Sequence, residues 1–206
     1  MSDLITPELV TLDANVGTDR SSVIRYFAEQ VAGQGRASKA DGLYADALAR
    51  EERTATGIPG GIALPHCRSK AVLVPTLAVA RLSPAVDFGA KDGPADLVFF
   101  IAGSPGTDAE HLKVLSKLAR SLIRKDFTAS LRAAETSEDV VRLVEGALGV
   151  GAGATAEAAA ARNDGVAQGG SVAGAAAAAA AVVVAAAGDA KATPAGQDPP
   201  GIRGGA

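Results

Sequence analysis

Residues 57–68 are Gly-Ile-Pro-Gly-Gly-Ile-Ala-Leu-Pro-His-Cys-Arg, and they are the most informative stretch of the chain. Three glycines open the stretch, a short apolar run follows, and His66 comes directly after a proline. The glycines predict a loop, and residues 62–64 predict a short strand that ends at His66. A histidine at a strand end, with an ordinary pKa of roughly 6.5, keeps a neutral nitrogen lone pair at cell pH. It can therefore act as a nucleophile.

The chain divides into two parts of different composition. All seven aromatic residues lie in residues 1–149, a length that can bury a core of ordinary domain size. Residues 150–206 hold 23 alanines and 11 glycines, with no leucine and no aromatic residue, so they have little to bury. We therefore expect one folded domain, 1–149, followed by a disordered Ala/Gly-rich linker or tail, 150–206.

Charge, cysteine content and apolar stretches limit the kind of partner and the compartment that we expect. Residues 1–149 carry 17 Lys and Arg against 19 Asp and Glu, without a basic block, so nucleic-acid binding is not expected. Cys67 is the only cysteine, which fits a reducing cytosol. The N-terminus has no signal-peptide pattern. The uncharged stretch 172–187 is mostly Ala and Val and falls short of the ~20 apolar residues that a span needs. We expect a cytoplasmic protein without a membrane span.

Helical and extended patterns alternate along residues 1–149. Strands are predicted from apolar and β-branched runs over residues 9–12, 62–64, 71–74, 76–82 and 96–102. Helices are predicted after the capping residues Thr18, Ser38 and Thr107, the last with Glu110 as a capping box and an end near Arg124, and again from Ser137. This interleaving predicts an α/β domain with a central mixed β-sheet flanked by helices on both faces.

Side chains at three separate positions meet the requirements of a phosphohistidine centre. Such a centre needs a neutral attacking nitrogen that is aimed outward, which His66 at a strand end can provide, and groups that match the phosphoryl charge. Arg50, in the second predicted helix, can contact two phosphate oxygens with its guanidinium. His111, in the first turn of a predicted helix, can donate a hydrogen bond where the helix dipole favours an anion. Backbone N–H groups around residues 57–61 (Gly57, Gly60 and Gly61) can add donors.

The residues alone also allow less specific interpretations. His66 and His111 can be structural histidines, and Arg50 can be a solvated helix charge. Cys67 can be a nucleophile or a zinc ligand next to His66. Zinc usually takes three or four protein ligands, and no third ligand has a suitable spacing. A small buried residue is the better interpretation of Cys67, and no cofactor or metal ion is expected.

Residues 50–69 resemble the active-site segment of the enzyme IIA domain of the bacterial phosphoenolpyruvate-dependent sugar phosphotransferase system, fructose/mannitol class. The family pattern is an Arg-Glu pair, a Thr-Gly loop and a Gly-x-Ala-x-Pro-His strand, which Arg50-Glu51 and Ala63-Leu64-Pro65-His66 fit. His111, opening a helix after a Gly/Pro loop, is similar to the family's second histidine. The resemblance extends from residue 1 to about 148, and residues 67–69 look more like the fructose branch than the mannitol branch.

The resemblance implies a phosphotransferase with a phosphohistidine intermediate. The phosphocarrier protein HPr would pass a phosphoryl group to His66, and His66 would pass it to a cysteine of an enzyme IIB domain. The membrane-embedded IIC domain would then import and phosphorylate fructose or a related sugar. Arg50 and His111 would neutralise the transferring group. The alternatives are a regulatory, nitrogen-type IIA that acts by phosphorylation-dependent partner binding, and a non-catalytic α/β module with structural histidines.

Overall fold

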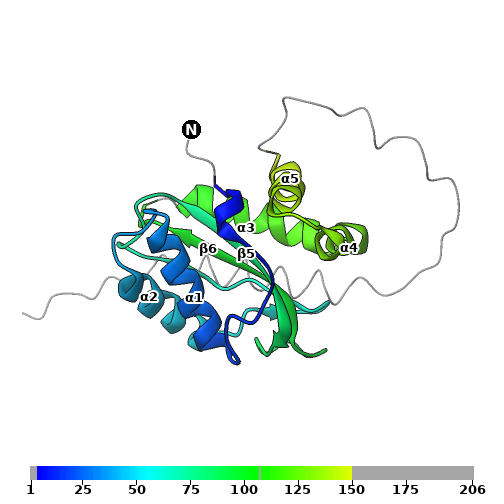
Figure 1. Ribbon diagram of the computed structural model, residues 1–206. Coiled ribbons are helices and arrows are strands. Elements are labelled where there is room, and N and C mark those ends of the chain that lie inside the picture. Colours follow the sequence, from blue (N-terminus) through cyan, green and yellow to red (C-terminus); the bar gives the residue numbers. More distant parts are fainter. Residues whose placement is uncertain (1–3, 107, 150–206) are drawn as a thin grey trace, which may run out of the picture.

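The computed structural model describes residues 4–106 and 108–149 of the chain (Figure 1). Helices and strands are interleaved along this part, as the sequence predicted. In chain order they are η1 Pro7–Leu9, β1 Val10–Ala14, α1 Arg20–Gly33, α2 Ala40–Arg53, β2 Gly57–Ile58, β3 Ile62–Ala63, β4 His66–Arg68, β5 Thr76–Val86, β6 Ala95–Gly103, α3 Asp108–Leu122, α4 Lys125–Ala133 and α5 Ser137–Leu148.

The strands form one mixed sheet. Its order is β1-β5-β6-β3-β2, and β4 pairs with β6 beyond the end of β3. β1 is parallel to β5, β5 is antiparallel to β6, and β3 and β4 are parallel to β6. β2 is antiparallel to β3. Because β3 and β4 follow each other along the same side of β6, His66 comes to lie opposite Ile101.

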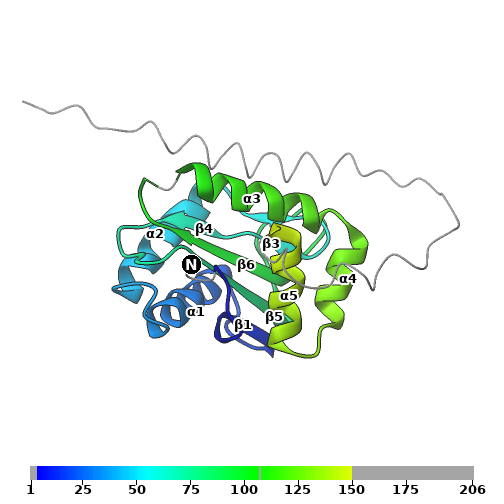
Figure 2. The ribbon, with the colours of Figure 1, turned by 90° about the horizontal axis from the view of Figure 1, so that it is seen from above.

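β6 is buried on both faces, which its continuous apolar sequence predicted. Leu97, Phe99 and Ile101 pack in one apolar cluster with α3, α4 and α5. The alternate residues of β6 pack in a second cluster with α1 and α2, where Phe27 stacks on Phe100 at 5.3 Å between ring centroids. Figure 1 shows the two helix layers on opposite faces of the sheet, and Figure 2 shows α5 lying over β1 and β5. The sheet therefore separates two cores.

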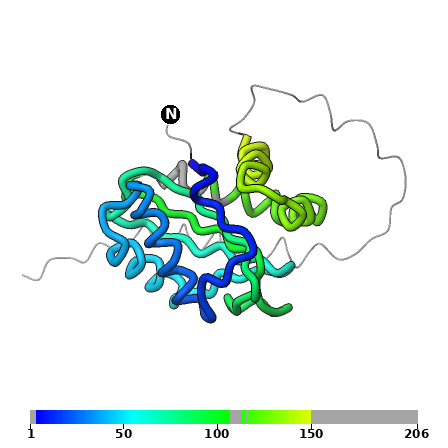
Figure 3. Tube along the Cα trace, in the orientation of Figure 1, coloured from blue at the N-terminus to red at the C-terminus, as the bar shows by residue number. Residues whose placement is uncertain are grey.

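α1 and α2 form a packed helical pair on one face, and their traces run side by side in Figure 3. α1 begins after Asp19, whose carboxylate accepts the Ser22 N–H at 2.9 Å. The cap is therefore one residue later than the predicted Thr18. Ser38, the predicted cap of α2, instead donates its hydroxyl to the Ala71 carbonyl at 3.3 Å. The two helices are confirmed, and only their starting residues shift.

The strand predicted over residues 71–74 is wrong. Val72 makes an isolated bridge with Ala37, and the Leu73 N–H donates to the Arg36 carbonyl at 2.9 Å. β4 and β5 lie on opposite sides of β6 and run in opposite directions. The connection between them has to cross the end of β6 and reverse, which leaves no room for a regular strand.

α4 was not predicted. α3 ends at Leu122, two residues before the predicted end, and α4 begins three residues later. The buried apolar side chains of α4 are Phe127 and Leu131, spaced one helical turn apart. Two such residues are too few for a helical period to stand out in the sequence.

Arg81 of β5 joins the sheet to the end of α4. Its Nε and Nη2 donate to the two carboxylate oxygens of Asp13 at 2.6 and 2.5 Å. Its Nη1 donates to the carbonyls of Leu131, Arg132 and Ala134 at 3.3, 2.7 and 2.8 Å. Carbonyls at the end of a helix lack helical donors, so one guanidinium satisfies them and holds β1, β5 and α4 together.

We predict that Arg81→Met lowers the free energy of unfolding by about 2 kcal/mol, because half-buried carbonyls at the end of α4 lose their donor. Urea unfolding followed by circular dichroism measures the change. Arg142→Met is the matched control, since the Arg142 side chain is 75% exposed in its pair with Asp139 and such surface pairs contribute little. Equal losses in the two variants would contradict the role given to Arg81.

Candidate functional site

The last turns of α2 carry two buried charged residues. Arg50 is 7% exposed and Glu51 is 1% exposed, although their polar surroundings in the sequence favoured a solvated helix end. α2 packs against β4, and Ala47 lies in the same apolar cluster as Cys67. Arg50 follows Ala47 at a spacing of three residues, which places both on one face of the helix. Arg50 therefore lies on the buried face of α2, the helix that packs against the strand containing His66.

His66 is the first residue of β4 and is 3% exposed. The ring is buried, so the expectation that its attacking nitrogen is aimed outward is wrong. Its register partner on β6 is Ile101, whose side chain packs with α3, α4 and α5. Register partners on neighbouring strands point to the same face of a sheet, so the imidazole lies on the α3 side. The next residue, Cys67, faces α1 and α2. No further strand covers the outer edge of β4 in residues 4–106 and 108–149, so the ring lies at an edge of the sheet.

The imidazole of His66 has a defined hydrogen bond. Its Nδ1 lies 2.8 Å from the carbonyl oxygen of Leu64. A carbonyl only accepts hydrogen bonds, so Nδ1 carries the proton and donates it. In the neutral ring the lone pair is then on Nε2, which is the nitrogen able to act as a nucleophile.

The loop after α2 connects the buried Glu51 to the strand before His66. The Glu51 carboxylate accepts the Thr56 N–H at 3.0 Å and the Thr56 hydroxyl at 2.6 Å. The Thr56 carbonyl accepts the Leu64 N–H at 3.1 Å. Leu64 is also the residue whose carbonyl accepts the ring proton of His66. A continuous set of contacts therefore runs from the end of α2 to the imidazole.

Burial determines the electrostatics at this end of α2. It raises the pKa of Glu51 above its ordinary value, while the two bonds from Thr56 and the charges of Arg20 and Arg50 act in the opposite direction. Arg50 Nη1 donates to the Thr54 carbonyl at 3.4 Å. A carboxyl group and a guanidinium are thus held out of bulk water beside the same loop.

The glycine-rich turn is closed by internal contacts. The Gly57 N–H donates to the Phe88 carbonyl at 2.9 Å, and the Gly60 N–H donates to the Asp92 carboxylate at 2.7 Å. The prediction that these two N–H groups serve as phosphate donors is therefore wrong. Gly60 and Gly61 have φ angles of +102° and +72°, which favour glycine, so the glycines shape the turn.

Arg132 of α4 fastens the same turn from the other side. Its Nη2 donates to the Gly60 carbonyl at 2.6 Å. Its Nε and Nη2 donate to the Asp96 carboxylate at 2.7 and 2.6 Å. A Cβ on Gly61 would lie 2.8 Å from that carboxylate, so the turn, β6 and α4 pack without spare space. Sequence reasoning missed this contact because Arg132 lies in the helix that it did not predict.

His111 lies in the first turn of α3, where the sequence predicted a helix start. Its side chain and that of Glu110 lie outside the described residues, as does Thr107. α2, which carries Arg50, packs against β4, which begins at His66, and the contact of the Arg50 side chain with the His66 ring stays a prediction. The joint placement of His111 with them stays a prediction.

Cys67 is buried, and its burial raises the pKa of the thiol, with a further contribution from the Asp46 charge. The thiol therefore stays protonated at neutral pH and is a poor nucleophile. The interpretation of Cys67 as a small buried residue is confirmed.

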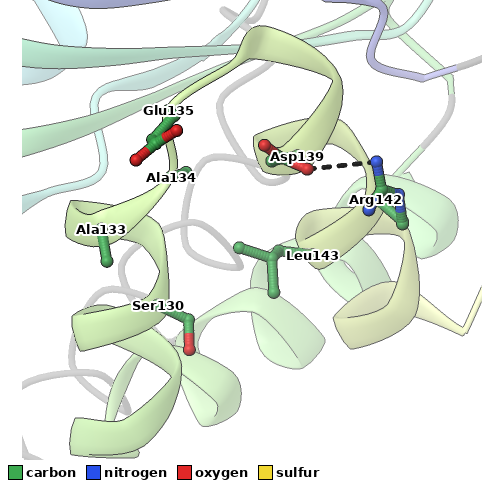
Figure 4. Close-up of a pocket in the computed structure, with 7 residues that line it drawn as sticks. All are labelled: Ser130, Ala133, Ala134, Glu135, Asp139, Arg142 and Leu143. Atoms are coloured by element: carbon green, nitrogen blue, oxygen red, sulfur yellow. Dashed lines mark ion pairs between the residues drawn. The ribbon is translucent and has the colours of Figure 1, made fainter. Parts of the chain in front are cut away.

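A pocket of about 500 Å³ lies between α4 and α5 (Figure 4). Figure 4 shows the ion pair between Asp139 and Arg142, 3.1 Å apart, on its wall. The pocket contains none of the predicted site residues. Within the described ranges, no group of three or more His, Cys, Asp or Glu residues is placed to hold a metal ion. No helix in those ranges is long and apolar enough to cross a bilayer.

Residues 3–147 match the family model described as "Phosphoenolpyruvate-dependent sugar phosphotransferase system, EIIA 2". The chain belongs to this family. It is a phosphoryl-transfer component of the EIIA kind within the phosphotransferase system. The resemblance seen in residues 50–69 is thereby confirmed for the family as a whole.

Two curated relatives are similar to the same degree. The chain is 36% identical to the fructose-specific EIIA component of Haloferax volcanii over 138 residues, 66% of this chain and 89% of that protein. It is also 36% identical to the nitrogen regulatory protein of Pseudomonas aeruginosa over 129 residues, 62% of this chain and 84% of that protein. The solved structure of nitrogen regulatory protein IIA-Ntr from Neisseria meningitidis is 28% identical, with a TM-score of 0.64, over 68% of this chain and 96% of that chain.

Other relatives are much longer than this chain. The fructose-specific EIIABC component of Bacillus subtilis is 30% identical over 145 residues, which are 70% of this chain and 23% of that protein. The chain therefore spans under a quarter of that relative.

Glu51→Gln is expected to change how stability depends on pH. Because folding raises the Glu51 pKa above 4.5, the folded state favours the protonated carboxyl. That stabilising contribution is complete below pH 4.5 and is lost as the pH rises through the raised pKa. Glutamine does not ionise, so the stability of Glu51→Gln has no such loss with pH. Its free energy of unfolding should therefore rise relative to that of the wild type as the pH rises toward neutrality.

Urea unfolding at a series of pH values measures this difference. Glu52→Gln is the matched control, because Glu52 is the next residue of α2 and is exposed. Parallel pH profiles for the wild type and Glu51→Gln would show that burial does not raise this pKa.

Proposed function

We propose that the protein carries a phosphoryl group on His66 between phospho-HPr and an enzyme IIB domain. In the first step the Nε2 lone pair attacks phosphorus, the P–N bond to the HPr histidine breaks, and its electron pair returns to that ring. In the second step a cysteine thiolate of IIB attacks the same phosphorus. The bond to His66 then breaks, and the lone pair on Nε2 is restored.

The hydrogen bond from His66 Nδ1 to the Leu64 carbonyl is the observation that carries this proposal. It fixes the tautomer that leaves Nε2 nucleophilic and restrains the orientation of the ring. It can persist after transfer, because phosphorylation of Nε2 leaves the Nδ1 proton in place. The 3% exposure of His66 limits the access of water to a phosphohistidine. The same burial requires the ring or its neighbours to move when a donor approaches.

Arg50 and His111 are proposed to balance the charge of the phosphoryl group. The Arg50 guanidinium can match two phosphate oxygens. It is 7% exposed, near the end of a helix that packs against β4, and the low effective dielectric constant around a buried guanidinium strengthens its attraction to an anion. His111 is proposed, from its place in the first turn of α3, to donate a hydrogen bond to a phosphoryl oxygen.

Fructose or a related sugar is the proposed final acceptor, because fructose-specific EIIA and EIIABC components are among the relatives. A regulatory role of the nitrogen type is the second candidate, supported by the equal identity to the nitrogen regulatory protein of Pseudomonas aeruginosa. Both candidates use the same phosphohistidine. They differ in whether the phosphoryl group passes on to an enzyme IIB domain or stays on His66 to control the binding of a partner.

Phosphoenolpyruvate, enzyme I and HPr together should load the wild-type protein with one acid-labile phosphate. His66→Ala should take up none, because the nucleophilic nitrogen is removed. Intact-mass spectrometry at neutral and acidic pH measures the label, and circular dichroism checks that the variant is folded. Undiminished label on folded His66→Ala would mean that another residue accepts the phosphoryl group.

Arg50→Lys is expected to slow transfer from phospho-HPr by roughly tenfold or more, because lysine keeps the charge and loses the two-point contact that orients the phosphoryl group. Single-turnover kinetics with radiolabelled phospho-HPr measure the rate. Arg53→Lys, an exposed change of the same type in α2, is the control and should keep the wild-type rate. A full rate in Arg50→Lys would show that Arg50 does not contact phosphate.

Onward transfer separates the two candidate functions. Phosphorylated protein mixed with a fructose-type IIB domain should pass its phosphate to the IIB cysteine if it serves sugar uptake. The measurement is the appearance of an S-phosphorylated IIB by intact mass, with a Cys→Ser IIB as the control. Phosphate that stays on His66 with every IIB domain tested would favour the regulatory function.

A further inference from the structure

Glu51 is a buried carboxyl group to which the proposed transfer assigns no role. It is 1% exposed, and burying a carboxylate is unfavourable unless its hydrogen bonds compensate. Its two oxygens accept the N–H and the hydroxyl of Thr56. Arg50, the preceding residue, is close enough for its charge to favour the ionised form of Glu51. To find the function of Glu51, we therefore follow the contacts that Thr56 and Arg50 make with other residues.

Thr56 supports the outer edge of the strand that leads to His66. The Pro65 carbonyl accepts the Ile101 N–H of β6 at 3.0 Å, so this residue bonds inward, to the sheet. Hydrogen-bonding directions alternate along an extended strand, so Leu64 bonds outward. Its N–H reaches the Thr56 carbonyl at 3.1 Å. The position of Leu64 is thus set by β6 on one side and by the Glu51–Thr56 loop on the other.

The same outward side of Leu64 carries the carbonyl that binds the ring. His66 Nδ1 donates to it at 2.8 Å. Two residues before Thr56, the Thr54 carbonyl accepts Arg50 Nη1 at 3.4 Å. One short loop therefore contacts the guanidinium directly and reaches the imidazole through Leu64, and Glu51 is the side chain that fixes this loop.

We propose that Glu51 is a positioning residue that sets the tautomer and orientation of His66, and the place of Arg50, through its two hydrogen bonds to Thr56. This role rests on the proposed phosphoryl-carrier function, and Glu51 itself does not touch the phosphoryl group. Glu51 holds Thr56, Thr56 holds Leu64, and the Leu64 carbonyl keeps the proton of His66 on Nδ1. Without Glu51 the imidazole is still present, but its proton is no longer held on Nδ1. Nε2 is then no longer the only nitrogen that carries a lone pair.

Nitrogen-15 NMR of the imidazole tests this role without any phosphoryl transfer. At a pH where the ring is neutral, the wild type should show His66 as the Nδ1–H tautomer. Glu51→Ala should shift the ring toward a mixture of tautomers. Glu52→Ala is the matched control, because it removes an exposed carboxylate one residue later, and its spectrum should equal that of the wild type.

A second pair of variants keeps the test decisive if Glu51→Ala does not fold. Thr56→Val keeps the backbone N–H and removes the hydroxyl bond of 2.6 Å, so it should shift the tautomer in the same direction. Thr56→Ser keeps both the N–H and the hydroxyl donor, so its spectrum should equal that of the wild type. A folded Thr56→Val with the unchanged Nδ1–H tautomer would overturn the proposal, as would an unchanged spectrum in folded Glu51→Ala.

Transfer kinetics supply the second readout. Folded Glu51→Ala or Thr56→Val should lower kcat for transfer from phospho-HPr by roughly tenfold, while KM stays within about twofold because docking of HPr is not altered. Glu52→Ala should change neither value. A fall that is confined to KM would contradict the positioning role. If the wild type accepts no phosphate, the proposed function fails, while the tautomer measurement still decides whether Glu51 positions His66.

Discussion

The register of β6 constrains where His66 lies. Its alternate side chains fill two different cores, so a slip of one residue would move each apolar side chain into the wrong layer. β3 and β4 pair with this buried strand and inherit its register. His66, on a strand at the sheet edge, is thereby fixed opposite Ile101 and on the α3 face. A buried nucleophile at the sheet edge obtains its position from the strand that is buried on both faces.

Apolar periodicity was sufficient to predict most of the fold. β6 stands out because seven consecutive residues, 96–102, include six apolar ones, and α1 and α2 stand out because one helical stripe of each faces the sheet. Segments 71–74 and 125–133 were misjudged for opposite reasons. The first has apolar residues but serves as a crossing around the end of β6, and the second is helical with only two buried apolar side chains. In both cases the outcome depends on neighbours that a local pattern does not contain.

The candidate site was predictable only in part, because it too depends on neighbours that a local sequence pattern does not contain. The proline and glycine pattern around His66, with the resemblance it carries, identified the segment. The sequence around Arg50 and Glu51 has the composition of a solvated helix end, yet both are buried, with Arg50 bonded to Thr54 and Glu51 to Thr56 of the loop that follows α2. The N–H groups of Gly57 and Gly60 were expected to bind an anion, and Phe88 and Asp92 take them instead. The contacts of the two glycines join residues some 30 positions apart.

The chain is equally identical to a fructose-specific and a nitrogen-regulatory relative, and a buried phosphohistidine site can serve both functions. In either proposed function His66 has to accept a phosphoryl group, and the buried loop that orients the imidazole serves both. The two functions differ in the partner that receives the phosphoryl group or reads it. Partner choice is set by the shape and charge of the exposed surface around a site, often through contacts that exclude the wrong partner. The distinction is therefore expected to lie in exposed residues near β4 and the end of α2.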